Sequence, residues 1–135
     1  MSQENVEIVR RAFTAGWRKP KPDFATVNEL FHPEFVLRSM FSAVEGRDFV
    51  GASGFREWLA NVNATWESWE SEVVNVEAID PDRVLLPVEN RFTSKEGVGL
   101  EQTTWFVVTV RDGKVTRAES YRSREDALEA AGLSE

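Results

Sequence analysis

The sequence contains no cysteine, which removes several kinds of chemistry at once. Without thiols the chain forms no disulfide and offers neither a thiolate nucleophile nor a thiolate metal site. Histidine is almost absent too, because His32 is the only one among 135 residues. A site built from several histidine ligands is therefore excluded, and we expect no metal ion.

An excess of positive charge is also lacking. The chain has 16 Lys and Arg against 23 Asp and Glu, a net charge of −7, whereas nucleic-acid binding requires a basic surface. Its glycines form neither a phosphate-binding loop nor a dinucleotide-binding pattern. We therefore expect no nucleic-acid partner and no cofactor.

Long hydrophobic runs are the third absence. The opening stretch MSQENVEIVRRAF places acidic residues before its basic ones and contains no extended apolar segment. This pattern is typical of neither a signal peptide nor a membrane span. We expect a cytoplasmic protein with no membrane partner.

What the chain does contain is the pattern of one α+β domain over residues 1–135. Its composition, 41% hydrophobic and 29% charged, is globular. Apolar residues at helical spacing predict helices at 2–16, 24–31 and 53–62, and a last helix that starts at Ser123 and ends at Gly132. Ser53 and Ser123 are the predicted N-caps of the last two. Alternating patterns predict strands at 34–39, 69–79, 83–93, 100–110 and 115–121, with a loop at 40–49. Helices grouped before an antiparallel sheet indicate the α+β class.

Four segments resemble a known family: ENVEIVRRAF, ELFHPEFVLR, GRDFVGASGFREWL and RDGKVTRAESYRSREDALEAAGLSE. With the element order, they resemble SnoaL-like proteins of the nuclear transport factor 2-like superfamily, relatives of polyketide cyclases and ketosteroid isomerase. The resemblance covers essentially the whole chain. It implies a cone, in which a strongly curved antiparallel sheet wraps around the N-terminal helices and a pocket lies inside the open end. It also implies a homodimer formed through the outer sheet face.

In the enzymes that the chain resembles, a carboxylate inside the cone, often Asp, works as general base. Here every Asp falls in a loop, a turn or a helix start, at positions 23, 48, 80, 82, 112 and 126. Alignment with ketosteroid isomerase places the base near Arg38 and the second, proton-donating Asp near Phe106. Both departures count against the same reaction here.

Three carboxylates remain within predicted strands, namely Glu89, Glu101 and Glu119. A carboxylate in an aromatic cone would have the raised pKa that a base working near neutrality requires. For each of them a solvated position on the outer face is the simpler interpretation, since a buried unpaired charge is costly. Glu119 is the best candidate, because Arg117 and Tyr121 would share its face.

The hypothesis for catalysis uses Glu119 or His32 as the base, and Arg38 or Tyr121 to stabilise developing negative charge. Each has a structural alternative. His32 precedes Pro33 at a predicted helix end, where it would satisfy the local turn. Arg38 could instead pair with Glu34, Glu89 or Glu101 at the rim.

Nine Phe and five Trp suggest that any cavity is apolar and suits a small hydrophobic molecule. Most of these aromatic residues must simply form the core. The expected ligand-binding residues are Phe13, Trp17, Phe31, Phe41, Phe55, Trp58, Asn90, Phe92, Gln102, Thr104, Phe106 and Ala118.

The hairpin that follows Gly99 decides which of these residues can act together. A two-residue type I′ turn at Asp112 and Gly113 would place Gln102, Thr104 and Phe106 on the face of Glu119 and Tyr121. A three-residue loop from Arg111 with a G1 bulge would exchange the faces of one strand. Thr104 and Phe106 would then face Ala118 and Ser120, while Glu119 and Tyr121 would join Trp105. The pattern of the resembling proteins favours the bulged form.

Two functions are consistent with these patterns. The first is a cofactor-free enzyme that cyclises, isomerises or dehydrates a small hydrophobic carbonyl compound. The second is a non-catalytic module for ligand binding or dimerisation. If Glu119 and His32 both face solvent, remote from the cavity, the mechanism proposed for the first function fails.

Overall fold

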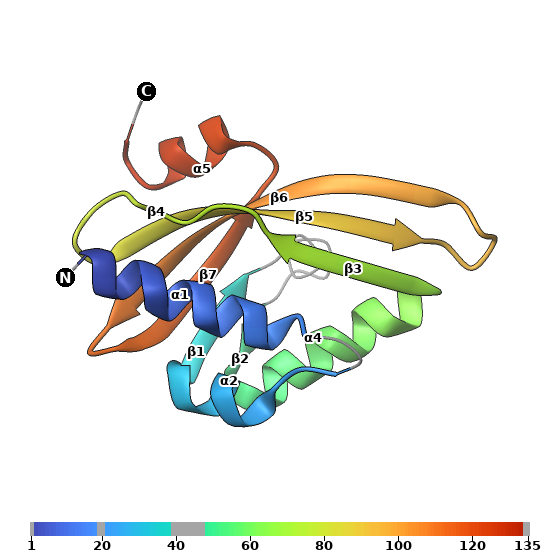
Figure 1. Cartoon of the computed structure of the whole chain (residues 1–135), viewed down its shortest axis with the longest axis horizontal. Coiled ribbons are helices and arrows are strands. Elements are labelled where there is room, and N and C mark those ends of the chain that lie inside the picture. The colour runs from blue at the N-terminus through green and yellow to red at the C-terminus, as the bar shows by residue number, and fades with distance from the viewer. Residues whose placement is uncertain (1, 19–20, 39–47, 134–135) are drawn as a thin grey trace.

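The computed structural model describes residues 2–18, 21–38 and 48–133 and confirms the α+β class (Figure 1). In chain order the elements are α1 (Ser2–Gly16), α2 (Phe24–Leu30), β1 (Phe31–Arg38), β2 (Phe49–Val50), α4 (Gly51–Thr65), β3 (Ser68–Val73), β4 (Glu77–Ala78), β5 (Arg83–Thr93), β6 (Gly99–Arg111), β7 (Lys114–Tyr121) and α5 (Arg124–Ala130).

The strands form one curved sheet in the order β2-β1-β7-β6-β5-β3, with β4 paired to β5. The expectation of a purely antiparallel sheet is wrong at one position, because β1 runs parallel to β7 and pairs Leu37 with Ala118. A parallel pair needs a long connection. Here the connection runs from residue 39 to residue 113, more than half of the chain, so nothing forces the two strands to run in opposite directions.

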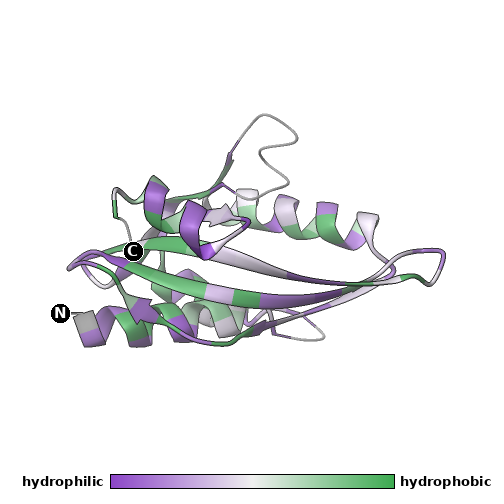
Figure 2. Cartoon of the chain, turned by 90° about the horizontal axis from the view of Figure 1, so that it is seen from above, coloured by the Kyte–Doolittle hydropathy of each residue, from purple (hydrophilic) through white to green (hydrophobic). Residues whose placement is uncertain are grey.

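Different helices pack against the two faces of the sheet. Helices α1 and α4 lie on one face and α5 lies on the other (Figure 1). The α1 and α4 face holds the main core, to which β5 contributes Val84, Leu86 and Val88. We call it the inner face. On the outer face, Leu85 and Val107 pack against Leu128 of α5. Figure 2 shows that the long strands are mostly hydrophobic where helices cover them and become hydrophilic toward the turn between β5 and β6. The cone is therefore filled at one end and open at the other.

Several predicted boundaries were wrong by a few residues. Phe31 takes an extended conformation, so α2 ends at Leu30 and β1 begins earlier than predicted. Helix α4 begins at Gly51, not near Ser53, and its N-cap Val50 provides no side-chain hydrogen bond. The strand predicted at 69–79 is two strands, β3 and β4, because residues 74–76 leave the ladder.

The last helix matches its prediction in detail. The Ser123 hydroxyl accepts a hydrogen bond from the Asp126 amide at 3.0 Å, which satisfies one of the free N–H groups of the first turn. Gly132 follows the helix with φ of 82°, a left-handed conformation that glycine adopts without strain. Both ends of α5 are thus set by local sequence.

The hairpin between β6 and β7 combines parts of both predicted forms. Its turn is the two-residue type, since Asp112 and Gly113 have φ of 52° and 76° and the flanking Arg111 pairs with Lys114. The register then shifts, which leaves Thr116 as the extra residue of a bulge. Its hydroxyl donates to the Thr109 carbonyl at 3.3 Å. Beyond the bulge the strand faces are those of the three-residue alternative.

Candidate functional site

The bulge places the proposed catalytic residues on the outer face. Beyond it Phe106 pairs with Ser120, and Val107 pairs with Glu119. Because side chains alternate along a strand, Phe106 and Ala118 face inward while Glu119 and Tyr121 face outward. Arg38 pairs with Glu119 across β1 and β7, so it lies on the outer face as well.

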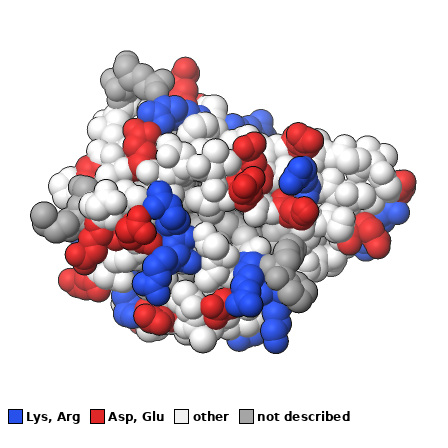
Figure 3. Space-filling view, in the orientation of Figure 1, with Lys and Arg blue, Asp and Glu red and all other residues white. Residues whose placement is uncertain are grey.

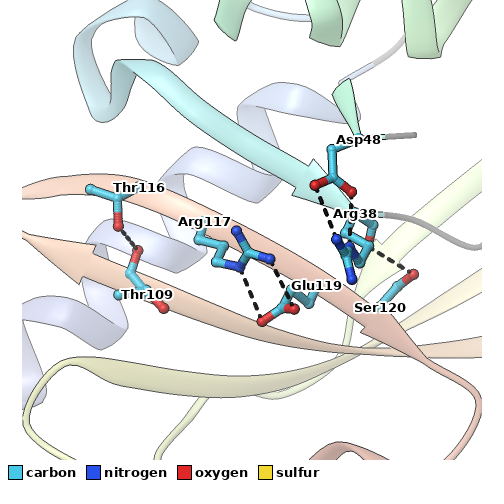
Figure 4. A network of polar contacts seen from close by, with 7 residues as sticks. All are labelled: Arg38, Asp48, Thr109, Thr116, Arg117, Glu119 and Ser120. Carbon is cyan, nitrogen blue, oxygen red and sulfur yellow. Dashed lines mark hydrogen bonds and ion pairs between the residues drawn. The ribbon is translucent and has the colours of Figure 1, made fainter. Parts of the chain in front are cut away.

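These outward residues form ion pairs with each other and with Asp48, the residue that precedes β2 (Figure 4). The Arg38 Nε donates to Asp48 Oδ1 at 2.8 Å, and the Arg117 Nε lies 3.3 Å from Glu119 Oε1. The partner of Arg38 is thus Asp48 and none of the three glutamates considered from the sequence. Pairing of two copies through this face stays a prediction.

Electrostatics on the outer face follow from these pairs. The hydrogen bond from Arg38 holds the pKa of the Asp48 carboxyl below its ordinary value. Burial, followed by the negative charge of Glu119, raises the pKa of the Tyr121 hydroxyl. A phenol with a raised pKa stays protonated at neutral pH, so Tyr121 can donate a hydrogen bond there but cannot act as a base.

The Arg38–Asp48 pair predicts a pH dependence of stability. Because the folded-state pKa of Asp48 is lowered, its contribution is present above the ordinary aspartate pKa and is lost as pH falls through the folded value. The pair is partly exposed, so we expect Asp48→Asn to lower the free energy of unfolding by less than about 1 kcal/mol at pH 7. Urea unfolding of both proteins at pH 7 and pH 3 measures this difference. A difference that is equal at the two pH values would contradict the assignment.

His32 does not reach the interior either. It is exposed at the start of β1, and its Nδ1 accepts a hydrogen bond from the Glu34 amide at 3.0 Å. Glu89 and Glu101 are exposed as well. The acid–base mechanism through Glu119 or His32 therefore has no geometric basis.

Aromatic side chains line a small cavity on the inner face, which we call the core cavity. Its volume is about 30 Å³, and every described residue around it is apolar: Ala12, Phe13, Gly16, Trp17, Phe31, Phe35, Leu37, Phe55, Trp58, Phe106 and Ala118. The rings meet closely, since the centroid of Phe13 lies 4.9 Å from that of Trp17 and 5.4 Å from that of Phe106. This space holds a water molecule but not a substrate.

One polar atom is buried at this apolar wall. Trp58 is only 7% exposed, and its indole Nε1 has no hydrogen-bond partner among the residues that the structure describes. The Trp66 Nε1 is also buried without such a partner, but Trp66 stacks on Phe92 and lines none of the described cavities. An unpaired buried donor costs about 1–3 kcal/mol, which an acceptor would recover.

A second, larger space, which we call the mouth cleft, lies at the open end of the cone. It has a volume of about 590 Å³ and is lined by Trp17 and residues 70–72, 89–91 and 101–103 of β3, β5 and β6. Ser71 and Gln102 flank Asn90 in one row across these strands. The row faces inward, because Asn90 lies two positions after Val88 on β5 and so shares the face on which Val88 packs in the core.

Hydrogen bonds join Ser71 to Asn90 within this row, and Asn90 to the neighbouring Thr104. The Ser71 hydroxyl donates to Asn90 Oδ1 at 2.6 Å, and Asn90 Nδ2 donates to the Thr104 hydroxyl at 2.9 Å. Asn90 and Thr104 are each 8% exposed. The side chains are therefore held in fixed orientations beside the cleft. Trp17 borders both the mouth cleft and the core cavity, and it separates the polar space from the apolar one.

The structure brings most of the predicted ligand-binding residues to these two spaces. The core cavity is lined by Phe13, Trp17, Phe31, Phe55, Trp58, Phe106 and Ala118, and the mouth cleft by Asn90 and Gln102. Phe92 instead packs on Trp66, and Phe41 lies outside the described residues. Sequence reasoning missed Phe35 and Leu37, although their alternation with Val36 and Arg38 is the signal of a strand with one buried face.

The described residues also bear on metal binding and on membrane insertion. Within residues 2–18, 21–38 and 48–133, no group of three or more acidic or histidine side chains is placed to hold a metal ion. None of the helices in this part of the chain is both long enough and apolar enough to cross a membrane.

Comparison with known proteins identifies the fold. TerC, crystallised with polyporic acid, is 23% identical with a TM-score of 0.74, and the match covers 89% of this chain and 92% of TerC. A putative SnoaL-like polyketide cyclase from Jannaschia sp. is 18% identical with a TM-score of 0.72, covering 89% and 85% of the two chains. A ketosteroid isomerase-like protein from Catenulispora acidiphila, in complex with trimethylamine, is 20% identical with a TM-score of 0.69, covering 94% and 93%. At these identities the likeness shows the fold alone.

No functionally curated protein matches this sequence significantly. The family comparison is decisive, however, because the model of the SnoaL-like domain matches residues 9–118, which is most of the chain. That range runs from the middle of α1 to Ala118 on β7, so it includes the helices and strands around the core cavity and the mouth cleft. The chain therefore belongs to the SnoaL-like domain family, with the nuclear transport factor 2-like fold.

Proposed function

We propose that this protein binds a small hydrophobic molecule that carries a carbonyl oxygen, at the junction of the mouth cleft and the core cavity. The observation that carries the proposal is the Trp58 indole N–H, which is buried beside an apolar cavity without an acceptor among the described residues. A carbonyl oxygen supplies that acceptor. The aromatic wall then covers the apolar body of the same molecule.

The row of polar side chains across β3, β5 and β6 supports the same class of ligand. Asn90, Gln102 and Ser71 line a cleft that is roomy enough for a molecule of several rings. Their amide and hydroxyl groups can donate and accept, so they suit a ligand with a polar end. The core cavity by itself is too small, so binding requires the Trp17 side chain to move and join the two spaces. The presence of polyporic acid in the TerC crystal is consistent with small-molecule binding in this fold.

Indole resonances in a ¹H–¹⁵N correlation spectrum test the proposal. We expect 2-acetylnaphthalene to shift the Trp58 indole N–H signal strongly, because a new hydrogen bond forms. The hydrocarbon 2-ethylnaphthalene, which has no carbonyl, should bind about tenfold more weakly, the value of one hydrogen bond to a buried donor.

Trp58→Phe should remove this preference for the ketone, while Trp66→Phe serves as the matched control and should keep it. If the ketone and the hydrocarbon bind the unmodified protein equally, or the Trp58 signal stays unchanged, the proposal is wrong.

Catalysis of a cyclase type is the second candidate. It is favoured by the shape and polarity of the site, since an apolar wall beside fixed hydrogen-bonding groups can hold a flexible molecule in a reactive conformation. The described residues around the core cavity include no titratable group, and the carboxylates of the site (Glu70, Glu72, Glu89 and Glu101) line the mouth cleft. Mass spectrometry after incubation with a carbonyl compound able to cyclise would detect the product.

A further inference from the structure

We propose that a third space, between the end of α1, α2 and α4, binds an organic anion with an apolar body. This anion cleft has a volume of about 290 Å³ and is lined by Gly16, Arg18, Lys21, Pro22, Phe24, Arg56, Leu59, Ala60, Asn63 and Trp69. It is distinct from the core cavity, with which it shares only Gly16 among the described lining residues. The inference is independent of the proposed function.

Three cationic side chains meet in this cleft, and none of them is firmly paired. Lys21 and Arg56 have no carboxylate partner among the described residues. The Arg18 NH1 lies 3.9 Å from Asp23 Oδ2, at the limit of an ion pair. Asp23 is already engaged, because its two oxygens accept hydrogen bonds from the Thr26 amide and hydroxyl. An anionic ligand would therefore meet open donors.

The charge of the chain as a whole makes this grouping unusual. The protein carries a net charge of −7, yet the described residues that line the cleft include three cations and no acidic side chain. Figure 3 shows several Lys and Arg side chains in the lower half of one face, over α1, α2 and α4 as drawn in Figure 1, with Asp and Glu side chains beside them. Like charges close together repel one another, so binding an anion between them lowers the free energy of the cluster.

The remaining walls define the rest of the ligand. The guanidinium carbon of Arg56 lies 4.0 Å from the centre of the Phe24 ring, so Phe24 holds the arginine in place through a cation–π contact. Leu59, Ala60 and Trp69 add apolar surface. The Trp69 Nε1 donates to Asn63 Oδ1 at 2.7 Å, which orients the Asn63 amide and leaves its nitrogen as a further donor.

A carboxylate attached to a hydrocarbon or aromatic body fits these features together. Arg18 and Arg56 offer planar forks that match the two carboxylate oxygens, and Lys21 offers a point charge. The apolar wall would contact the body of such a ligand. A bare inorganic anion would leave this wall uncovered. The cleft thus selects an amphipathic organic anion over phosphate.

The experiment uses 2-naphthoate as probe and the indole N–H signals of the full-length protein as readout. We expect naphthoate to shift the Trp69 signal in a saturable way, since Trp69 lines the anion cleft, whereas a Trp58 shift would report the core cavity. The neutral analogue 2-naphthalenemethanol and inorganic phosphate should each bind at least about tenfold more weakly, because each lacks one of the two recognised features.

Charge-removing variants complete the test. Arg56→Gln and Lys21→Gln should each weaken naphthoate binding about tenfold, the effect of one charge-assisted hydrogen bond. Both side chains are exposed, so the fold should be kept, and Arg11→Gln on the exposed part of α1 is the matched control and should bind normally. Equal binding of naphthoate and the alcohol, equal binding of phosphate, or unchanged affinity in both variants would each overturn the proposal. A Trp58 response without a Trp69 response would overturn it while leaving the proposed function intact.

Discussion

Replacing Gly54 with alanine is expected to destabilise the protein by about 1–3 kcal/mol, the usual cost of overpacking a filled site. A Cβ at this position would lie 2.8 Å from the Phe49 carbonyl carbon and 3.2 Å from its Cα. These are backbone atoms of β2, so α4 must shift away from the strand to make room. The direction of this change in unfolding free energy is informative, because alanine in a helix interior is ordinarily more favourable than glycine by about 1 kcal/mol.

Gly99→Ala is the control for this prediction. Gly99 begins β6 and has open space where the Cβ would be, and its φ lies outside the left-handed region. We expect its free energy of unfolding to stay within about 0.5 kcal/mol of the unmodified protein. Urea unfolding of the three proteins, followed by tryptophan fluorescence, measures both effects. A Gly54→Ala protein as stable as the parent would show that α4 does not dock on β2 by direct backbone contact.

Replacing Phe106 with alanine should have the larger effect, a loss of about 3–5 kcal/mol of unfolding free energy. Phe106 is 3% exposed, and its ring contacts those of Phe13 and Trp17 at the wall of the core cavity. Removing the ring extends a cavity whose other walls are apolar. Such a cavity stays dry and accepts a small apolar molecule. We therefore expect saturating toluene to raise the melting temperature of Phe106→Ala by more than it raises that of the unmodified protein.

Phe92→Ala separates the loss of an aromatic ring from the opening of this cavity. Phe92 is only partly buried and stacks on Trp66, away from the core cavity. Removing the Phe92 ring should cost less than removing that of Phe106, and toluene should raise the melting temperature of Phe92→Ala no more than that of the unmodified protein. Toluene stabilisation of both variants alike would mean that the core cavity is not the site that opens.

Local sequence was sufficient for elements whose ends depend on a few adjacent residues. The Ser123 cap and Gly132 define α5, and Asp112 with Gly113 defines the turn of the last hairpin. In each case the deciding interaction lies within four residues along the chain. The aromatic character of the core cavity was also predictable, because the spacing of Phe13 and Trp17 on α1 and of Phe55 and Trp58 on α4 places each pair on one helix face.

Local sequence did not predict which side chains of a strand face the interior. One extra residue, Thr116, turns Glu119 and Tyr121 to the outer face. A bulge depends on which strand lies opposite and on how the sheet bends, and no signal in residues 111–121 alone decides it. The same holds for Arg38, whose partner Asp48 directly precedes the neighbouring strand β2. The acid–base mechanism expected from the sequence depended on these strand faces, because it needed the Glu119 side chain to face the interior.

By itself, therefore, the sequence determined the α+β class, the helices and the aromatic lining, because these follow from periodicity and short-range hydrogen bonding. It indicated the family through the resemblance of four segments. Only the tertiary structure decided which polar side chains face the interior, that β1 runs parallel to β7, and that three cations meet beside Phe24. Those features arise where segments far apart in the chain pack together. Their positions depend on the register and curvature of the whole sheet, which no single segment specifies.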